Sequence, residues 1–301
     1  MSVDGYVVGI DGGGTSARAV VTDANLVIYG EGKVESVNPV VVGREVAAER
    51  IHEAVREALE IAGIAPEAVR VAGIGVAGAA ATHSETWLRE VVTGVLPAAV
   101  VVPSTDYEIA LVGAHGKREG VLVLAGTGSL AYGVNAAGES MLVGGYGYLL
   151  GDEGGGYWLG LHGLKAVIAA SEGRAAQTLL TDLLLGALNL NTPRELIPWL
   201  YRSESPRVRD IAALAPMVVD CAGNDQAAYD IVMAGAQHLE TYVSTVVQHL
   251  SIVEPAIAFA GSLLSRPNAL SDALCAWLGL ETPPIPLYPP MIGAALLALE
   301  K

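Results

Sequence analysis

The stretch "VVGIDGGGTSARAVV" (residues 7–21) decides the fold. A short apolar run ends at Asp11 and three glycines follow it, after which small or apolar residues alternate with polar ones. This alternation is the period of a strand and not that of a helix. The stretch therefore predicts two strands joined by a glycine turn, and "NLVIYGEGKV" (residues 25–34) predicts a third strand after them.

The same pattern returns near the middle of the chain. "VLVLAGTGSLAYGV" (residues 121–134) again places a glycine turn between two strands, and a further turn and strand follow it. The segments after each opening predict helices and strands in alternation, which indicates an α/β fold of two similar halves. The expected helices cover residues 44–63, 84–92, 156–171, 225–250 and 290–300, and the expected later strands cover residues 69–78, 98–104 and 256–262.

The composition limits the function classes. The 301 residues are 52% hydrophobic and 16% charged, with a net charge of -15, so the chain can build large cores but has no basic face for a duplex or a membrane surface. No signal-peptide pattern opens the chain, and no apolar run reaches the ~20 residues of a membrane span. Cys221 and Cys275 form no paired motif. We therefore expect a soluble cytoplasmic protein with two buried thiols.

The glycine motifs have several interpretations. "GIGVAG" (residues 73–78) and "GTGSLA" (residues 126–131) match the dinucleotide fingerprint, but that fingerprint needs a helix directly after the glycines. A P-loop needs a lysine that neither glycine turn contains. Backbone amides in a tight turn can bind an anion without lysine, whereas a single such turn is more often an ordinary hairpin. Two turns at equivalent places favour phosphate contacts, here by the backbone and hydroxyl groups of Gly13, Gly14, Thr15, Gly126, Thr127 and Gly128.

Asp11 lies at the end of the first strand, immediately before its glycine turn. A carboxylate beside a polyphosphate is repelled unless a divalent cation lies between them. Mg²⁺ is typically held by one or two carboxylates together with phosphate oxygens and water. The position therefore predicts that Asp11 is a magnesium ligand.

A set of ordered motifs resembles one known family. The chain carries, in order, "GIDGGGT", "VNP", "STDYEIA", "LAGTGS", "GGYGYLLGDEGGGYWLG" and "FAGSLL". They resemble the N-acetylglucosamine kinase and archaeal-type hexokinase group of the BadF/BadG/BcrA/BcrD ATPase family, within the hexokinase–actin–Hsp70 superfamily. The resemblance implies two ribonuclease-H-like (actin-type ATPase) α/β domains with a nucleotide cleft between them. We expect residues 1–105, joined by the helix at 290–301, to form one domain and residues 106–289 the other.

The resemblance also implies roles for particular residues. Asp106 matches the catalytic base, although its position alone would favour a helix N-cap. Asn38 matches a sugar-binding asparagine, although a turn residue before Pro39 is the simpler interpretation. Thr15 and Thr127 match phosphate contacts, and Gly261, Ser262 and Ala212 match the nucleotide pocket.

The loop "GGYGYLLGDEGGG" resembles the family segment that contacts the sugar ring. It makes Gly145, Tyr146, Gly147 and Asp152 candidate substrate ligands, with Glu153 expected to cap the following helix. The N-acetylglucosamine kinase pattern has tryptophan where this chain has Tyr146 and serine where it has Gly155. These two departures leave the identity of the sugar open.

The expected activity is ATP- and Mg²⁺-dependent transfer of the γ-phosphoryl group to the 6-hydroxyl of an amino sugar, N-acetylglucosamine or glucosamine. A broad hexokinase is the alternative. An activator of an iron–sulfur dehydratase would need cysteine ligands, and "GDEGGGYW" carries none. A DNA-binding regulator would need a further domain before the first strand, which the sequence does not indicate. The expected partner is a small-molecule sugar, with a homodimer possible in this family.

Overall fold

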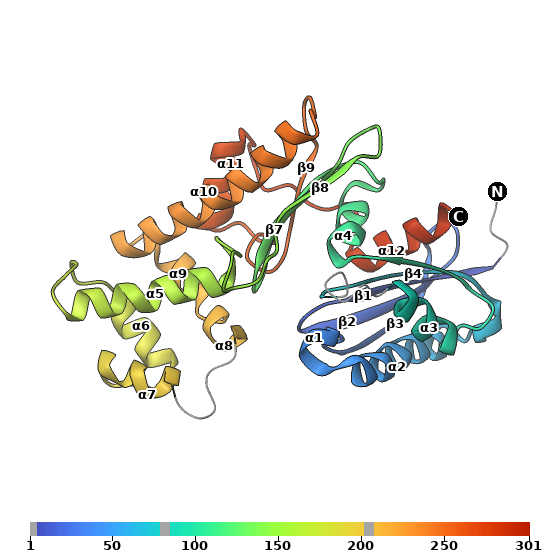
Figure 1. Ribbon diagram of the computed structural model, residues 1–301, viewed down its shortest axis with the longest axis horizontal. Coiled ribbons are helices and arrows are strands. Elements are labelled where there is room, and N and C mark those ends of the chain that lie inside the picture. Colours follow the sequence, from blue (N-terminus) through green and yellow to red (C-terminus); the bar gives the residue numbers. More distant parts are fainter. Residues whose placement is uncertain (1–4, 79–84, 202–207) are drawn as a thin grey trace. The chain divides into compact units, whose positions relative to one another are not determined.

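The computed structural model describes residues 5–78, 85–201 and 208–301. They form two compact units. The first unit comprises Met1–Gly120, Ala136–Gly138 and Pro286–Lys301, and the second comprises Val121–Asn135 and Glu139–Ile285. Figure 1 shows a mixed α/β structure whose strands lie in two separate sheets, as the sequence predicts.

The sheet of the first unit has the strand order β3-β2-β1-β4-β5. The central strand β1 pairs antiparallel with β2 and parallel with β4, so the opening hairpin lies beside a parallel crossover. The predicted opening of three strands joined by turns is confirmed. The strands are β1 (Tyr6–Gly12), β2 (Ser16–Thr22), β3 (Ile28–Glu35), β4 (Val69–Val76) and β5 (Val100–Ser104).

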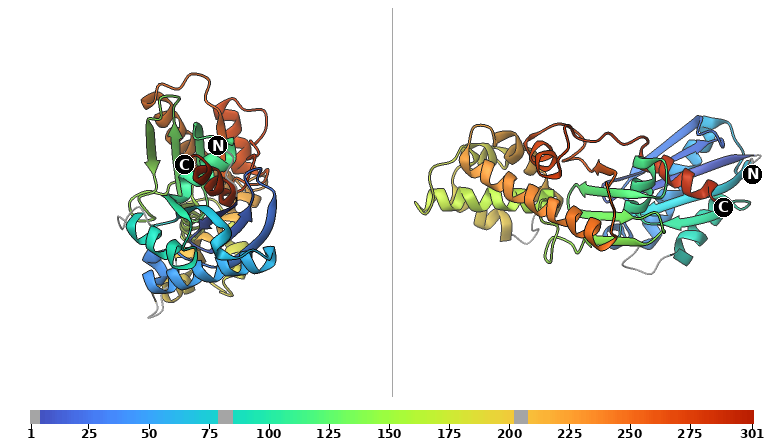
Figure 2. Two further views of the ribbon diagram at one scale, coloured as in Figure 1. Left: turned by 90° about the vertical axis from the view of Figure 1, so that its right-hand side faces the viewer. Right: turned by 90° about the horizontal axis from the view of Figure 1, so that it is seen from above.

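Helices cover both faces of this sheet (Figures 1 and 2). On one face, α2 (Arg44–Ala62) packs on β2 and β3 and is flanked by α1 (Pro39–Val42) and α3 (Glu85–Val95). The apolar spacing of α2 predicts a buried stripe, and Ile51, Val55 and Leu59 are buried. Gly63 ends the helix in the left-handed conformation at φ 66°, as the sequence indicates. A short 3₁₀ turn, Pro66–Ala68, leads into β4.

The opposite face carries α4 (Asp106–His115) and α12 (Pro290–Leu299). Here the backbones nearly touch. A Cβ atom at Gly9 would lie 1.9 Å from the carbonyl oxygen of Met291, and one at Gly73 would lie 1.8 Å from that of Ala294. A Cβ atom at Gly293 would lie 1.9 Å from the carbonyl oxygen of Ile109. Small residues therefore let α12 lie directly on the strands and on α4.

Because of this packing, the boundary between the units lies later in the chain than the sequence predicts. The sequence interpretation divides the chain at residues 105/106, whereas the first unit extends to Gly120 and includes α4. The reason is that α4 packs against both the sheet and α12 with most of its residues buried, so it belongs to the core of the first unit. The C-terminal helix lies in the first unit although it follows the second unit in the chain.

The second unit has a four-stranded sheet in the order β8-β7-β6-β9. Strands β6 and β7 are neighbours in this sheet and form its strand-turn-strand opening. Strand β8 pairs antiparallel with β7, and β9 pairs parallel with β6. The strands are β6 (Gly120–Ala125), β7 (Ser129–Val134), β8 (Ser140–Gly144) and β9 (Ile257–Ala260). The second half thus opens like the first, as the repeated sequence pattern predicts.

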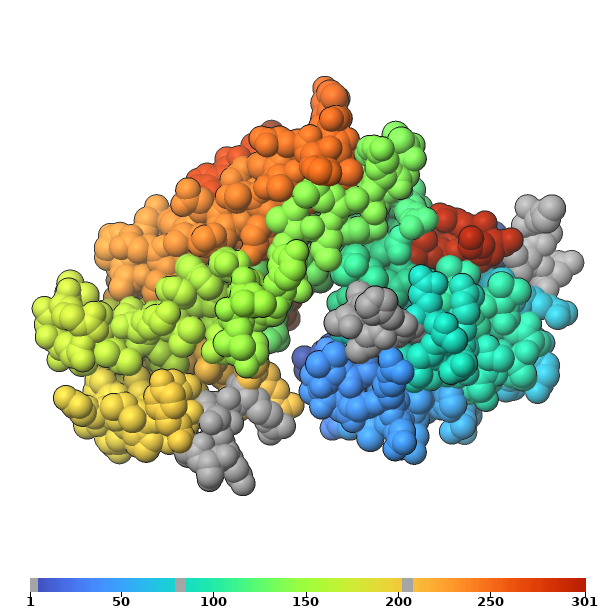
Figure 3. All heavy atoms as spheres, viewed as in Figure 1, coloured from blue at the N-terminus to red at the C-terminus, as the bar shows by residue number. Residues whose placement is uncertain are grey.

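Two long helices organise the second unit. Helix α5 (Gly156–Ser171) and helix α10 (Gln226–His249) pack against one another and lie side by side in Figures 1 and 3. Asp225 caps α10 by accepting the Ala228 N–H at 2.9 Å. The remaining helices are α6 (Leu180–Ala187), α7 (Leu196–Tyr201), α8 (Val208–Ala212), α9 (Ala215–Cys221) and α11 (Ala269–Leu278), with a 3₁₀ turn at Pro193–Glu195.

Both cysteines are buried in the apolar core of the second unit, as expected from the sequence. Within residues 5–78, 85–201 and 208–301, no helix is both long and apolar enough to cross a membrane.

We predict that Gly73→Ala lowers the free energy of unfolding by about 1–3 kcal/mol or more, because the new methyl group forces α12 off the sheet. Gly186→Ala is the matched control. A Cβ atom at Gly186 in α6 would contact nothing within 4 Å, so that variant should match the wild type or gain up to ~1 kcal/mol. Urea unfolding followed by circular dichroism measures both, and equal stabilities would contradict the proposed packing.

Candidate functional site

The first glycine turn lies at the tip of the β1–β2 hairpin. The Gly13 N–H donates to the Ser16 carbonyl at 3.0 Å and closes the turn. Gly14 and Thr15 are exposed, and a Cβ atom at Gly14 would meet nothing within 4 Å. The turn therefore presents its backbone and the Thr15 hydroxyl to solvent.

Ser36 connects this turn to Asn38. The buried Ser36 hydroxyl donates to the Gly13 carbonyl at 3.4 Å and accepts the Asn38 N–H at 3.3 Å. Asn38 caps α1, because its Oδ1 accepts the Val40 N–H at 2.9 Å. Asn38 thus acts as a turn residue through its side-chain carbonyl oxygen, as the simpler interpretation of the sequence predicts.

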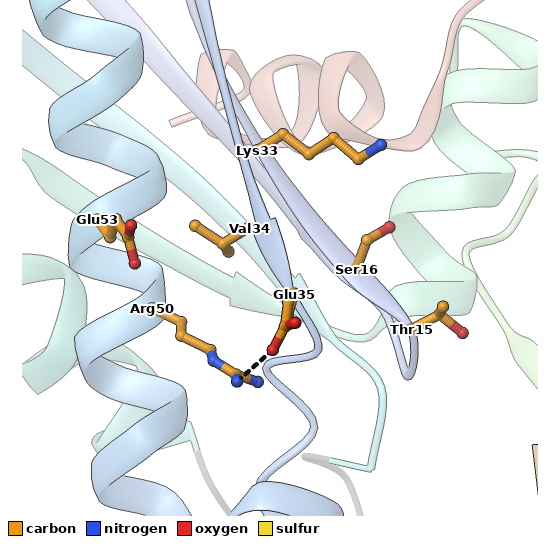
Figure 4. A pocket seen from close by; sticks show the side chains of 7 residues that line it. All are labelled: Thr15, Ser16, Lys33, Val34, Glu35, Arg50 and Glu53. Atoms are coloured by element: carbon orange, nitrogen blue, oxygen red, sulfur yellow. Dashed lines mark hydrogen bonds and ion pairs between the residues drawn. The ribbon is translucent and has the colours of Figure 1, made fainter.

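A pocket of about 580 Å³ lies beside the hairpin in the first unit. Figure 4 shows Thr15 at the hairpin tip and Arg50 reaching from α2 toward Glu35. Arg50 donates to the Glu35 carboxylate at 2.6 Å and to the Ser36 carbonyl at 2.7 Å. Its guanidinium group therefore serves to fix the segment between β3 and Asn38. The pocket is lined by Thr15, Ser16, Lys33, Val34, Glu35, Arg50 and Glu53.

Two carboxylates from distant parts of the sequence meet beside this turn. Asp11 lies at the end of β1, and its partner in the register of β4 is Gly75. A Cβ atom at Gly75 would lie 2.5 Å from the Thr105 carbonyl, so the missing side chain lets the start of α4 lie on the sheet. Asp106 is the first residue of α4 and is close enough to raise the pKa of Asp11.

The surroundings disfavour the charged forms of both acids. Burial, and then the charge of Asp106, raise the pKa of Asp11 from 3.8 to about 7, while Arg18 on the neighbouring strand opposes this. Burial also raises the pKa of Asp106 above its usual value, against hydrogen bonds from the backbone of Tyr107 and of Asp106 itself. Two carboxylates with raised pKa values in one place are typical of catalytic or cation-binding positions.

The second glycine turn is held by the start of α5. The Gly156 N–H donates to the Gly126 carbonyl at 2.7 Å, and the Tyr157 N–H donates to the Thr127 carbonyl at 3.0 Å. A trans peptide directs its C=O and N–H to opposite sides. Since the carbonyls of Gly126 and Thr127 face α5, the N–H groups of Thr127 and Gly128 face away from it. This orientation gives two adjacent amide donors, as an anion site requires.

Other predicted nucleotide residues surround the second turn. Gly261 follows β9 in the left-handed region at φ 86°, and a Cβ atom there would lie 2.3 Å from the Ala125 carbonyl. A Cβ atom at Gly156 would lie 3.3 Å from both the side chain and the carbonyl of Ala212. The structure thus gathers three of the proposed nucleotide segments within the second unit. Ser262 directly follows Gly261.

Asp152 joins this turn to the loop after β8. Its carboxylate accepts the backbone N–H groups of Ser129 and Gly147, which lower its pKa, but burial raises the pKa more strongly and it lies above its usual value. In the same loop, the Gly145 N–H donates to the Ser129 carbonyl at 3.0 Å. Tyr146 is 76% exposed, so its ring is available to a ligand.

The structure corrects two sequence interpretations. Thr105, and not Asp106, is the N-cap of α4, and it accepts the Glu108 N–H at 3.2 Å. Glu153 does not cap α5, because the first amides of α5 already donate to the second glycine turn. Glu153 instead accepts a hydrogen bond from Tyr242 of α10.

The glycines of "GIGVAG" have structural roles. Gly73 accommodates α12, Gly75 accommodates α4, and Gly78 adopts φ 76° beside the Asn38 side chain. Gly73 and Gly75 lie within β4 itself and not in a turn after the strand, so the spacing matches the dinucleotide fingerprint but the position of the glycines does not.

The candidate residues thus form two groups. The first unit brings together Asp11 and Asp106, and links Gly13 to Asn38. The second unit brings together the turn at 126–128, Asp152, Ala212 and Gly261. Sequence reasoning missed Ser36 and Tyr242, whose types and spacing carry no signal. Among the described residues, no cluster of three or more His, Cys, Asp or Glu side chains could hold a metal ion.

The chain is similar to known proteins over nearly its whole length. A sequence model of the BadF/BadG/BcrA/BcrD ATPase family matches residues 8–298. An N-acetylmuramic acid/N-acetylglucosamine kinase of Clostridium acetobutylicum is 31% identical over 288 residues, which cover 93% of this chain and 92% of that protein. A glucosamine kinase of Vibrio cholerae is 30% identical over 275 residues, covering 91% and 90% of the two chains.

The fold is also found in solved structures. The crystal structure of a predicted N-acetylglucosamine kinase from Chromobacterium violaceum superposes with a TM-score of 0.78 at 25% identity. The match covers 98% of this chain and 99% of that one.

We predict that Asp11→Asn stabilises the metal-free protein more at pH 8 than at pH 5, by about 1–3 kcal/mol. With a folded pKa near 7 and an unfolded pKa near 3.8, the folded state binds the Asp11 proton more tightly. The wild type therefore loses stability as the pH rises from about 4 to about 7, and asparagine removes this loss. Urea unfolding in EDTA measures the difference.

The exposed Asp220 in α9 provides the control, because Asp220→Asn should show no such pH dependence. An Asp11→Asn effect that is equal at both pH values would contradict the buried-carboxylate geometry.

Proposed function

Because the chain belongs to the BadF/BadG/BcrA/BcrD ATPase family, we propose that it is an ATP-dependent sugar kinase. The substrate class we propose is an amino sugar, N-acetylglucosamine or glucosamine, phosphorylated at its 6-hydroxyl. The names of the similar Clostridium and Vibrio kinases support this choice. The observation that carries the proposal is the half-buried Asp106 carboxylate beside Asp11 and the first glycine turn.

Asp106 is the proposed general base. Phosphoryl transfer to an alcohol proceeds through a loose transition state in which positioning and charge stabilisation provide most of the catalysis. The sugar hydroxyl attacks the γ-phosphorus, its proton passes to Asp106, and ADP leaves. A positioned carboxylate contributes roughly 10²–10⁴-fold to such a step. The raised pKa of Asp106 supports this role, because a more basic carboxylate accepts the proton more readily.

Asp11 is the proposed magnesium ligand. A half-buried carboxylate whose pKa is raised next to a second carboxylate fits a divalent cation, which would relieve both the desolvation and the repulsion. When bound with ATP, Mg²⁺ neutralises charge on the phosphate oxygens. Water and phosphate oxygens would supply the remaining ligands, since Mg²⁺ commonly uses only one or two protein carboxylates.

Backbone amides are the proposed phosphate ligands. In the turn at Gly13, Gly14 and Thr15, the Gly13 N–H is bonded to Ser16, so Gly14 and Thr15 would supply N–H groups and Thr15 a hydroxyl. In the turn at Gly126, Thr127 and Gly128, the Gly126 N–H is bonded to the Gly128 carbonyl, so Thr127 and Gly128 would supply N–H groups and Thr127 a hydroxyl. The outward N–H groups of Thr127 and Gly128 support this role. Gly261, Ser262 and Ala212 would contact the nucleoside, because they surround the same turn.

Each unit carries candidate sugar ligands. Asn38 keeps its Nδ2 as a donor, since its Oδ1 is occupied by Val40. Asp152 accepts two amides, which leaves further lone pairs of its carboxylate for a sugar hydroxyl. In the loop after β8, Gly145 and Gly147 would approach the sugar by backbone, and the exposed ring of Tyr146 would pack against it.

A dehydratase activator is not favoured. Iron–sulfur clusters are held by cysteine thiolates, and the two cysteines of this chain are 7% and 3% exposed in a core of apolar side chains. A broader hexose range, a homodimer and a cytoplasmic location stay predictions.

We predict that Asp106→Asn lowers kcat by ~10²-fold or more while the affinity for ATP stays within a few-fold of the wild type. Asparagine keeps the size of the side chain but cannot accept the proton. Asp182→Asn is the matched control, since Asp182 is also in the first turn of a helix but is exposed. Steady-state kinetics and calorimetric ATP titration provide the data. Near-normal turnover in Asp106→Asn would exclude it as the base.

The substrate class is tested by ADP release across glucose, mannose, glucosamine, N-acetylglucosamine, N-acetylmannosamine and N-acetylmuramic acid. We expect the highest kcat/KM for an amino sugar, and ³¹P NMR of its product should show the phosphate on the 6-hydroxyl. A preference for glucose would support the broad hexokinase instead. If no sugar stimulates ADP release above the basal rate, the kinase proposal is wrong.

A further inference from the structure

Tyr242 lies where the two ends of the loop after β8 meet α10. Its hydroxyl donates to the Oε2 atom of Glu153, at the end of the loop. At the start of the loop, a Cβ atom on Gly144 would lie 2.8 Å from the Tyr242 ring. Burial, and then Glu153, raise the pKa of Tyr242 far above its usual value, so the phenol keeps its proton. One side chain of a rigid helix thus contacts both ends of the loop.

Glu153 transmits this contact to the second glycine turn. Its backbone carbonyl accepts the Ser129 hydroxyl at 2.7 Å, directly after the turn at 126–128. The preceding residue, Asp152, has a left-handed backbone at φ 60°, a conformation that costs free energy in a residue other than glycine. Contacts on both sides of Asp152 are therefore needed to maintain it.

The left-handed backbone sets the place of the Asp152 carboxylate. A Cβ atom on Gly128 would lie 2.2 Å from Asp152 Oδ2, so the carboxylate lies directly against the glycine turn. From there it accepts N–H groups from Ser129 on one side and Gly147 on the other. A single carboxylate thus links the proposed phosphate turn to the proposed sugar loop.

We propose that Tyr242 is a positioning residue that, through Glu153, holds Asp152 between the phosphate turn and the sugar loop. The inference rests on the proposed kinase function and adds to it a residue of α10 that touches neither substrate. Because both loops share one carboxylate, binding of nucleotide at the turn and of sugar at the loop are energetically coupled. Loss of the Tyr242 hydroxyl frees Glu153 and weakens this coupling.

The test is Tyr242→Phe, which keeps the ring against Gly144 and removes the hydroxyl. We expect the KM for the amino sugar to rise by about tenfold, the factor that corresponds to ~1.4 kcal/mol for a hydrogen bond to a charged group. The affinity for a nonhydrolysable ATP analogue alone should change by less than about twofold, and the analogue should no longer improve sugar binding. Tyr229→Phe, an exposed tyrosine on the same helix, is the control and should behave as wild type.

Variants of Glu153 separate positioning from general stability. Glu153→Gln retains a neutral acceptor oxygen for Tyr242 and should raise the KM by only about two- to threefold, whereas Glu153→Ala should reproduce Tyr242→Phe. The double variant Tyr242→Phe/Glu153→Ala should be no worse than either single change, since both remove one interaction. Additive losses, or a normal sugar KM in Tyr242→Phe, would overturn the proposal.

Hydrogen exchange distinguishes failure of this inference from failure of the kinase function. In Tyr242→Phe, amides of residues 144–153 should exchange about tenfold faster, while those of β6 are unchanged. This readout needs no sugar and no turnover, so it applies even if the wild type phosphorylates none of the sugars. Unchanged exchange at residues 144–153 would overturn the role of Tyr242, whatever the activity.

Discussion

Direct contact between helix backbone and strand backbone is the constraint on which the first unit depends. Gly9 and Gly73 leave no room for a side chain beneath α12, and Gly75 leaves none beneath α4. Helices normally stand off a sheet by the thickness of their side chains, but here the carbonyl groups approach the strands themselves. That close approach brings Asp106 beside Asp11 although they are far apart in the sequence. The proposed chemistry of the first unit thus depends on glycine, which has no side chain, at these three positions.

The chain is strongly acidic, and its candidate phosphate contacts use the backbone. Arg50 is occupied by Glu35 and Ser36, so the donors left beside the first turn are Lys33, backbone N–H groups and hydroxyls. In the second turn, the start of α5 orients the donors by binding the opposite side of the same peptides. A site of this kind attracts polyphosphate weakly at long range. It relies on a bound cation and on pre-arranged amides at short range.

Much of the fold could be predicted from local patterns. The period of two around the glycine turns predicts the paired strands, and the helical spacing after Arg44 with Gly63 predicts α2. The contacts between distant residues could not be predicted, because nothing near Tyr242 points to Glu153 and nothing near Gly75 points to Thr105. The domain boundary was displaced for the same reason: it depends on the packing of α4 against α12. The prediction that Glu153 caps α5 was wrong because the free N–H groups at the start of a helix can be satisfied by any nearby carbonyl, here those of Gly126 and Thr127.

The position of α12 has a consequence for biosynthesis. This helix completes the first unit, but it follows the whole second unit in the chain. During translation, β1 and β4 therefore emerge early with an uncovered apolar surface, and their covering helix emerges only after the second unit. The second unit, in contrast, is continuous apart from residues 136–138 and can fold before α12 emerges. The first unit therefore cannot complete its core until α12 has emerged, and over that interval it is the part of the protein that is more exposed to misfolding.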